Sequence, residues 1–231
     1  EAEAEAGGGH WREGVFPGAD ISLQAPDLIN CATNEFYGHG AILRAYCRVD
    51  GFLPLVGRIQ HGWAPYKYAI DEGEVFVGNR GVSVPIWPKY AWSERTTMPG
   101  AHIIGAPYVY MPPLEDPGPV SNALLAIPVH GIAHSKLHGL DEYLGCVSGF
   151  AKERGFESVT VLLYNTDIGQ APRLEQMGFR VETCGAPFDL PYLRRLRNII
   201  RQHSAVTSDR ICTAAFYALY ENRRFYIAGN K

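Results

Sequence analysis

The chain has 231 residues, of which 46% are apolar, 12% aromatic and 19% charged. This composition excludes a disordered chain, and the length suffices for one large domain or two small ones. The formal charge is −3, and acids and bases balance once the three acids of the opening Glu-Ala tract are set aside, which argues against nucleic-acid binding through bulk charge.

Residues 1–9 read EAEAEAGGG. The Glu-Ala repeat resembles the remnant of a trimmed yeast secretion leader followed by a glycine linker, and it is equally compatible with a natural tail. We leave this segment out of the fold prediction.

Residues 10–118 alternate short apolar strands with amphipathic stretches, as expected for an α/β domain. A helix is predicted to begin at the Gly38-His39-Gly40 turn, with Ile42, Leu43 and Tyr46 on its inner face. Strands are predicted at residues 28–32, 55–60, 74–77, 84–87 and 102–104. Five prolines within residues 107–119 predict a linker there.

Residues 119–231 predict a regular alternation of strands and helices. The predicted strands are 123–127, 158–164, 179–184, 205–208 and 225–228, and the predicted helices are 140–154, 173–177, 191–202 and 211–220. The inward positions of the two longest helices are Leu140, Tyr143, Leu144, Val147, Phe150, Ala151, Leu193, Leu196, Ile199 and Ile200. This succession favours a parallel sheet with right-handed crossovers.

The first chemical motif is R-I-Q-H-G-W-A-P-Y-K at residues 58–67. It places His61 where a strand is predicted to end, and ligands bind at the carboxyl edge of parallel sheets. An imidazole there can take a proton from an acceptor hydroxyl near neutral pH. The alternative is a histidine that bonds to backbone at a strand end.

The second motif, V-T-S-D-R-I-C-T at residues 206–213, joins a strand to a helix N-terminus. Backbone N–H groups and the helix dipole favour an anion at such a junction, and Thr207, Ser208 or Thr213 can add a hydroxyl donor. The alternative is an ordinary helix cap.

The third motif, P-V-H-G-I-A-H-S-K-L-H at residues 128–138, carries His130, His134 and His138 at a spacing of four. On a helix, these side chains could bind zinc. Gly131 argues for a loop instead, and no nearby acid supplies a fourth ligand, so we expect no metal. Contact with a donor phosphate or a structural role remain the alternatives.

These motifs resemble stretches of two transferase families. The first is similar to Q-x-W-H-G-T-P-x-K of the CDP-glycerol glycerophosphotransferases that build teichoic acids, and to Q-H-G-W of bacterial capsule glycosyltransferases. The second and third resemble S-N-S-V-G-T and P-x-H-S-x of the capsule enzymes. This chain departs from those patterns in having Trp63 after His-Gly, Cys212 in place of a glycine, and Arg223-Arg224 in place of Lys-Pro.

The resemblance implies a compact GT-B-like fold, in which two Rossmann-like halves, 10–118 and 119–231, face each other across a cleft. It implies that His61 is the catalytic base and that Thr207, Ser208, Thr213, His130 and His134 bind the donor. The acceptor side would comprise Tyr37, His39, Gln60 and Trp63. Arg173, Arg194 or Arg195 could neutralise the leaving diphosphate. Asp71-Glu72-Gly73 resembles a short sialyltransferase motif and makes Asp71 or Glu72 an alternative base.

The expected function is therefore a metal-independent glycosyltransferase of bacterial surface polysaccharide synthesis, without a cofactor. Its partners would be a nucleotide-activated sugar and a glycan or glycolipid acceptor, with no nucleic acid and at most peripheral membrane contact. Glycerol-phosphate transfer, nucleotide-sugar epimerisation and non-catalytic binding of nucleotide or glycan remain alternatives. The five scattered cysteines show no C-x-x-C pair, and they favour the cytoplasm, with the inner membrane face as one possible position.

Overall fold

The computed structural model describes residues 33–49, 59, 84–86, 101–113, 120–128 and 139–229. These residues belong to two compact units. The first, which we call the sheet unit, contains residues 120–128, 139–186 and 194–229. The second, which we call the α2 unit, contains residues 33–49, 59, 84–86, 101–113 and 187–193.

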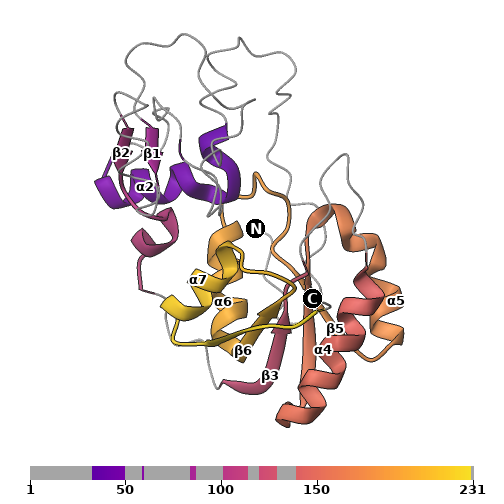
Figure 1. The fold of residues 1–231 in the computed structure, drawn as a ribbon. Coiled ribbons are helices and arrows are strands. Elements are labelled where there is room, and N and C mark those ends of the chain that lie inside the picture. Colours follow the sequence, from indigo (N-terminus) through magenta and orange to yellow (C-terminus); the bar gives the residue numbers. More distant parts are fainter. Residues whose placement is uncertain are drawn as a thin grey trace. The chain divides into compact units, whose positions relative to one another are not determined.

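The sheet unit is built on five parallel strands (Figure 1). The strands are β3 (Ser121–Ala126), β4 (Ser158–Leu163), β5 (Arg180–Thr183), β6 (His203–Ser208) and β7 (Arg224–Ile227). Their order across the sheet is β5-β4-β3-β6-β7, and every neighbouring pair is parallel. The first strand in the sequence, β3, therefore lies in the middle of the sheet.

Helices connect these strands, as parallel neighbours require. They are α4 (Leu140–Arg154), the 3-10 helix η5 (Asn165–Gln170), α5 (Ala171–Gln176), α6 (Tyr192–Gln202) and α7 (Thr213–Tyr220). Figure 1 shows α4 and α5 on one face of the sheet and α6 and α7 on the other. The predicted α/β class with a parallel sheet is confirmed.

Residues 123–126 of β3 form a continuous apolar run, and the packing of the sheet unit explains why. Residues 123–126 of β3 are all buried, because helices cover both faces of a parallel sheet. Leu124 and Ala126 pack with the inner face of α4 and with Ala171 and Leu174 of α5. The inward residues predicted for α4 are buried except Phe150, which is partly buried against this core.

Two glycines set the ends of α4 at the predicted residues. Gly139 precedes the helix and Gly155 follows it, and both have φ of 71°, a left-handed conformation that glycine adopts without strain. By contrast, α7 begins two residues later than predicted, because Cys212 is extended (φ −137°, ψ 177°) and serves as its N-cap.

The α2 unit contains a 3-10 helix η2 (Thr33–Gly38), helix α2 (His39–Cys47), parallel strands β1 (Val84–Ile86) and β2 (Ala101–Ile103), and a second 3-10 helix η4 (Pro107–Tyr110). The predicted linker at residues 107–119 is wrong for its first four residues. Pro107 begins η4, a position that suits its fixed φ, and Tyr108 is fully buried.

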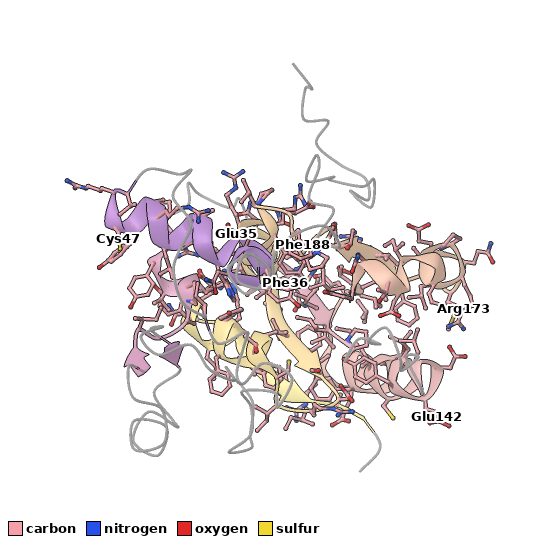
Figure 2. The ribbon with its side chains drawn as sticks, turned by 90° about the horizontal axis from the view of Figure 1, so that it is seen from above. Glu35, Phe36, Cys47, Glu142, Arg173 and Phe188 are labelled. Atoms are coloured by element: carbon pink, nitrogen blue, oxygen red, sulfur yellow. The ribbon has the colours of Figure 1, made fainter. Side chains whose placement is uncertain are left out.

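The segment 187–193 packs against η2. The ring of Phe36 stacks on Phe188 with centroids 4.2 Å apart (Figure 2), and Tyr37 lies 4.6 Å from Tyr192. Tyr37 has a positive φ of 58°, and its N–H donates to the carbonyl of Pro187. A left-handed tyrosine costs on the order of 1 kcal/mol, which this bond and the ring contacts offset.

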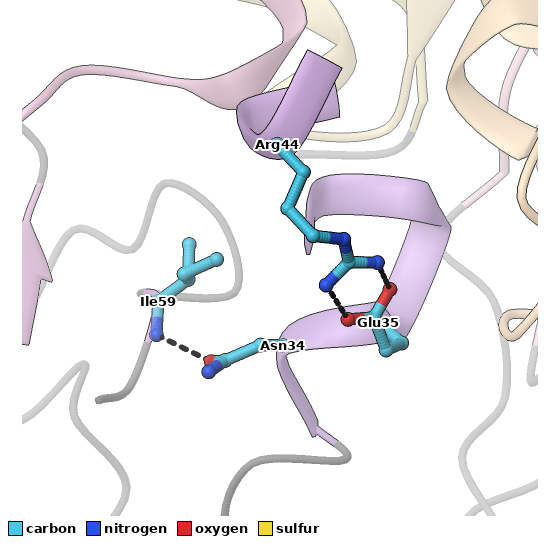
Figure 3. Close-up of polar contacts among 4 residues, drawn as sticks. All are labelled: Asn34, Glu35, Arg44 and Ile59. Carbon is cyan, nitrogen blue, oxygen red and sulfur yellow. Dashed lines mark hydrogen bonds and ion pairs between the residues drawn. The ribbon is translucent and has the colours of Figure 1, made fainter. Parts of the chain in front are cut away.

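The inner face predicted for α2 is wrong at Tyr46, which is 61% exposed. Arg44 is buried in its place because its guanidinium donates two bonds to the carboxylate of Glu35, at 2.6 and 2.8 Å (Figure 3). The hydrogen bond to Glu35 raises the pKa of Arg44, so the guanidinium stays protonated. A paired arginine can be buried, which a purely apolar pattern does not anticipate.

None of the helices within the described residues has the length and apolar character needed to cross a membrane.

Candidate functional site

The strand order places a reversal point between β3 and β6. From β3 the chain proceeds outward to β4 and β5, then returns across the sheet to β6 and β7. The connections that follow β3 and β6 therefore diverge to opposite faces, and open α/β sheets bind ligands outside the carboxyl ends of the strands at such a point. We take the carboxyl ends of β3 and β6 in the sheet unit as the candidate site.

Backbone bonds align the strand ends at the candidate site. The N–H of Ile127 donates to the carbonyl of Thr207 at 2.8 Å, and the N–H of Ala228 donates to the carbonyl of Ser208 at 3.0 Å. These bonds hold the ends of β3, β6 and β7 at one level.

Two of the predicted donor-binding residues end β6. Thr207 and Ser208 are both fully buried. The hydroxyl of Ser208 donates to Asp209 Oδ1 at 3.3 Å, whereas Thr207 Oγ1 is buried without a hydrogen-bond partner in the described part of the chain. These hydroxyls lie beneath the surface of the strand ends, so Ser208 acts on the site by orienting Asp209.

The third, Thr213, is the first residue of α7 and is partly exposed. The cap residue Cys212 makes no side-chain hydrogen bond to the helix, and the first turn carries no acid. Helix α4, which begins after β3, has Asp141 and Glu142 in its first turn instead. Because acids at a helix N-terminus repel anions, the beginning of α7 suits an anionic ligand and that of α4 does not.

Arg210, which was not among the predicted site residues, lies between Ser208 and the start of α7. Its Nε and Nη2 atoms donate to Asp209 Oδ2 at 3.1 and 3.0 Å, and its side chain is 66% exposed. The pairing neutralises Asp209 and holds a guanidinium beside the start of α7. The feature of the sequence that could have identified Arg210 is its position between a strand end and a helix start.

Tyr143 of α4 supports the β6 connection from the other side. Its hydroxyl donates to the carbonyl of Thr207 at 3.2 Å. Burial raises the pKa of Tyr143, and the nearby Asp209 raises it further, so the phenol stays protonated and remains a donor. Gly229 lies close to both of these residues. A Cβ at this position would be 3.4 Å from Asp209 Cβ and 3.8 Å from Tyr143 Cδ2.

The predicted acceptor-side residues Tyr37 and His39 lie in the α2 unit. Their rings are 5.8 Å apart, and His39 is only 2% exposed. The nearby Asn34 accepts a hydrogen bond from the N–H of Ile59 through its Oδ1 at 2.9 Å (Figure 3). Ile59 is not part of a strand, and the other residues of the strand predicted at 55–60 lie outside the described residues. This bond fixes the backbone just before Gln60 and His61 in the sequence.

The predicted base, its two alternatives, the other acceptor-side residues and the donor-binding histidines lie outside the described residues. They are Gln60, His61, Trp63, Asp71, Glu72, His130 and His134. The structure thus brings Thr207, Ser208 and Thr213 to one edge of the sheet, and the roles of the others stay predictions.

Within the described residues, no group of three or more His, Cys, Asp or Glu side chains is arranged to hold a metal ion. Cys47, Cys184 and Cys212 are thiols that form no disulfide within the described part of the chain. Burial raises the pKa of Cys184, so this thiol stays protonated and is a poor nucleophile.

Comparison with models of known protein families finds no match to this chain, and comparison with curated proteins finds none either.

Proposed function

We propose that this chain is a glycosyltransferase that moves a sugar from a nucleotide-sugar donor to a hydroxyl of a glycan or glycolipid acceptor. The observation that carries the proposal is the reversal of strand order at β3 and β6, which puts residues 207–213 at the edge of the sheet where such folds bind ligands. The resemblance of the same residues to a capsule-transferase motif supports the sugar donor.

In this proposal the donor diphosphate lies against the start of α7, with Arg210 and Thr213 as its side-chain donors. The acceptor oxygen bonds to the anomeric carbon while the bond from that carbon to the diphosphate oxygen breaks. A base, proposed to be His61, takes the proton of the acceptor hydroxyl, and the diphosphate leaves with the bonding electron pair. Helix N–H groups and a guanidinium stabilise the negative charge that develops on the leaving group.

The direct test is nucleotide binding measured by calorimetry on Arg210→Ala and Thr213→Ala. Each change removes a donor to a charged phosphate and is expected to weaken nucleoside diphosphate binding by about 1.5–3 kcal/mol, roughly 10- to 150-fold. Lys152→Ala is the matched control, because Lys152 is an exposed cation in the last turn of α4. Equal affinities in all four proteins would contradict the assignment of the donor to α7.

A product assay with CMP-, CDP-, UDP- and GDP-sugars then separates transfer from its alternatives. Transfer requires an acceptor, and it yields a glycoside and free nucleotide. Conversion of the donor sugar without acceptor would identify an epimerase, and binding without turnover would identify a non-catalytic binding protein.

A further inference from the structure

A cavity of about 580 Å³ lies in the sheet unit beside the first turn of α4. One wall comes from residues 139–142, and the other comes from η5 and the start of α5. These segments follow β3 and β4, so the cavity opens at the same carboxyl edge of the sheet as the proposed donor site. Its volume is in the range of small-molecule sites, about 300–1,000 Å³.

Arg173 joins the two walls of this cavity. Its Nη1 donates to Asp141 Oδ1 at 2.6 Å on the α4 side, and its Nε donates to Gln170 Oε1 at 3.1 Å. Figure 2 shows Glu142 on α4 and Arg173 on α5, the two helices that lie side by side in Figure 1. Glu142 Oε2 lies 3.4 Å from the place that a Cβ on Gly139 would take, so this carboxylate folds back toward the cavity wall.

The lining restricts the class of ligand. The side chains that carry its polar chemistry are Asp141, Glu142, Thr166, Asp167, Gln170 and Arg173. Among the described lining residues, Leu140 is the one large apolar side chain and none carries an aromatic ring, so this part of the lining offers no matching surface to a nucleobase or an acyl chain. The described lining residues carry three carboxylates and one guanidinium, which is itself bonded to Asp141, and this balance of charge disfavours phosphate.

Sugar hydroxyls fit this set of groups. Each hydroxyl can donate to a carboxylate and accept from an amide or guanidinium, and two neighbouring hydroxyls on a ring can bind one carboxylate together. We propose that this cavity binds the vicinal hydroxyls of a sugar ring, with Asp167 and Glu142 as acceptors. The inference rests on the proposed transferase function and adds to it the place where a sugar is recognised, separate from the phosphate site at α7.

The sugar could be the ribose of the nucleotide or the transferred or accepting hexose, and matched ligands distinguish them. We would measure by calorimetry the binding of UDP, CDP, GDP and CMP, of their 2′,3′-dideoxy analogues, and of free glucose, galactose and N-acetylglucosamine. The variants are Asp167→Asn and Glu142→Gln. Their controls, Glu175→Gln and Glu153→Gln, alter exposed acids of α5 and α4 outside the lining.

Ribose in the cavity predicts that a ribonucleotide binds at least tenfold more tightly than its dideoxy analogue, and that the two cavity variants remove this difference while the controls keep it. A hexose in the cavity predicts binding of a free sugar that the cavity variants weaken tenfold and the controls do not. Sugar binding at the cavity with no binding of any nucleotide would support the inference and overturn the proposed function.

Nucleotide binding that needs Arg210, is equal for ribo and dideoxy forms, and is accompanied by no sugar binding that depends on Asp167 or Glu142 would overturn the inference and keep the proposed function. Failure of every nucleotide and sugar to bind the folded wild-type protein would overturn both.

Discussion

His203, the first residue of β6, is a buried histidine with both ring nitrogens in hydrogen bonds. Nδ1 lies 2.7 Å from the carbonyl of Ile199, and Nε2 lies 2.8 Å from Thr160 Oγ1. A carbonyl can only accept, so Nδ1 carries the proton and Nε2 accepts from the threonine hydroxyl. Burial lowers the pKa of His203, and Arg180 lowers it further, while the bond to Ile199 acts in the opposite direction. The neutral form of the His203 ring is therefore favoured in the folded protein.

This pairing predicts a pH dependence of stability. Because the pKa of His203 is lower in the folded than in the unfolded state, the unfolded chain binds more protons as the pH falls below about 6.5. The free energy of unfolding is therefore expected to decrease from pH 7 to pH 5, and His203→Gln, which keeps a polar side chain but cannot titrate, is expected to decrease less steeply. Urea unfolding across this range measures both slopes. Parallel slopes would show that His203 does not contribute, since the other titrating groups are common to both proteins.

A buried ion pair connects α6 to the end of α7. Arg197 Nε lies 2.6 Å from Glu221 Oε1 and Arg201 Nε lies 3.6 Å from Glu221 Oε2, and the side chains of Arg197 and Glu221 are only 10% and 8% exposed. Glu221 is the C-cap residue of α7. The pair lets α6 bury an arginine among its predicted apolar positions, which are all buried as expected. The ion pair therefore links α6 and α7, the two helices on this face of the sheet.

Glu221→Ala is expected to destabilise the protein by about 3 kcal/mol, because it leaves the buried guanidinium of Arg197 without its carboxylate. Glu153→Ala, on the exposed face of α4, is the control and should change the free energy of unfolding by less than about 0.5 kcal/mol. Denaturant titration measures both. The double variant Arg197→Met/Glu221→Leu should recover most of the loss, because apolar side chains can replace a buried pair at little cost. A loss below about 1 kcal/mol in Glu221→Ala would mean that the pair does not join the helices.

The elements that could be predicted from the sequence are those with a clear apolar period or a glycine at each end. Helix α4 has both, and its bounds match the prediction. The connection between β4 and α5 has neither, because η5 is a polar 3-10 helix without a buried residue. The cavity beside Arg173 depends on that connection, so it could not be predicted from the pattern, and Arg173 was expected instead as one of three candidates to neutralise the diphosphate.

At the scale of the whole molecule, the sequence placed Thr207, Ser208 and Thr213 together because a strand followed by hydroxyls and a helix is a local pattern, whereas it did not single out Arg210. It could not predict that Thr207 and Ser208 are fully buried, since burial depends on the neighbouring strands β3 and β7 and on Tyr143 of α4. The division of the proposed chemistry, with the acceptor at residues 10–118 and the donor at residues 119–231, stays a prediction.

That division is tested by His61→Ala in the intact protein. If His61 is the base, its loss removes proton abstraction but no contact with the donor, so turnover should fall by about 10²- to 10⁴-fold while the affinity for nucleotide stays within about twofold of wild type. Arg210→Ala should show the opposite balance, with weakened nucleotide binding, because its guanidinium is proposed to meet the diphosphate. Calorimetry and a product assay on the same preparations give both quantities.

Retained turnover in His61→Ala, with loss of turnover on changing Asp71 or Glu72 to the corresponding amide, would transfer the role of base to that acid. Loss of nucleotide binding in a folded His61→Ala protein would instead place the donor against residues 10–118, and the two halves would exchange their proposed roles.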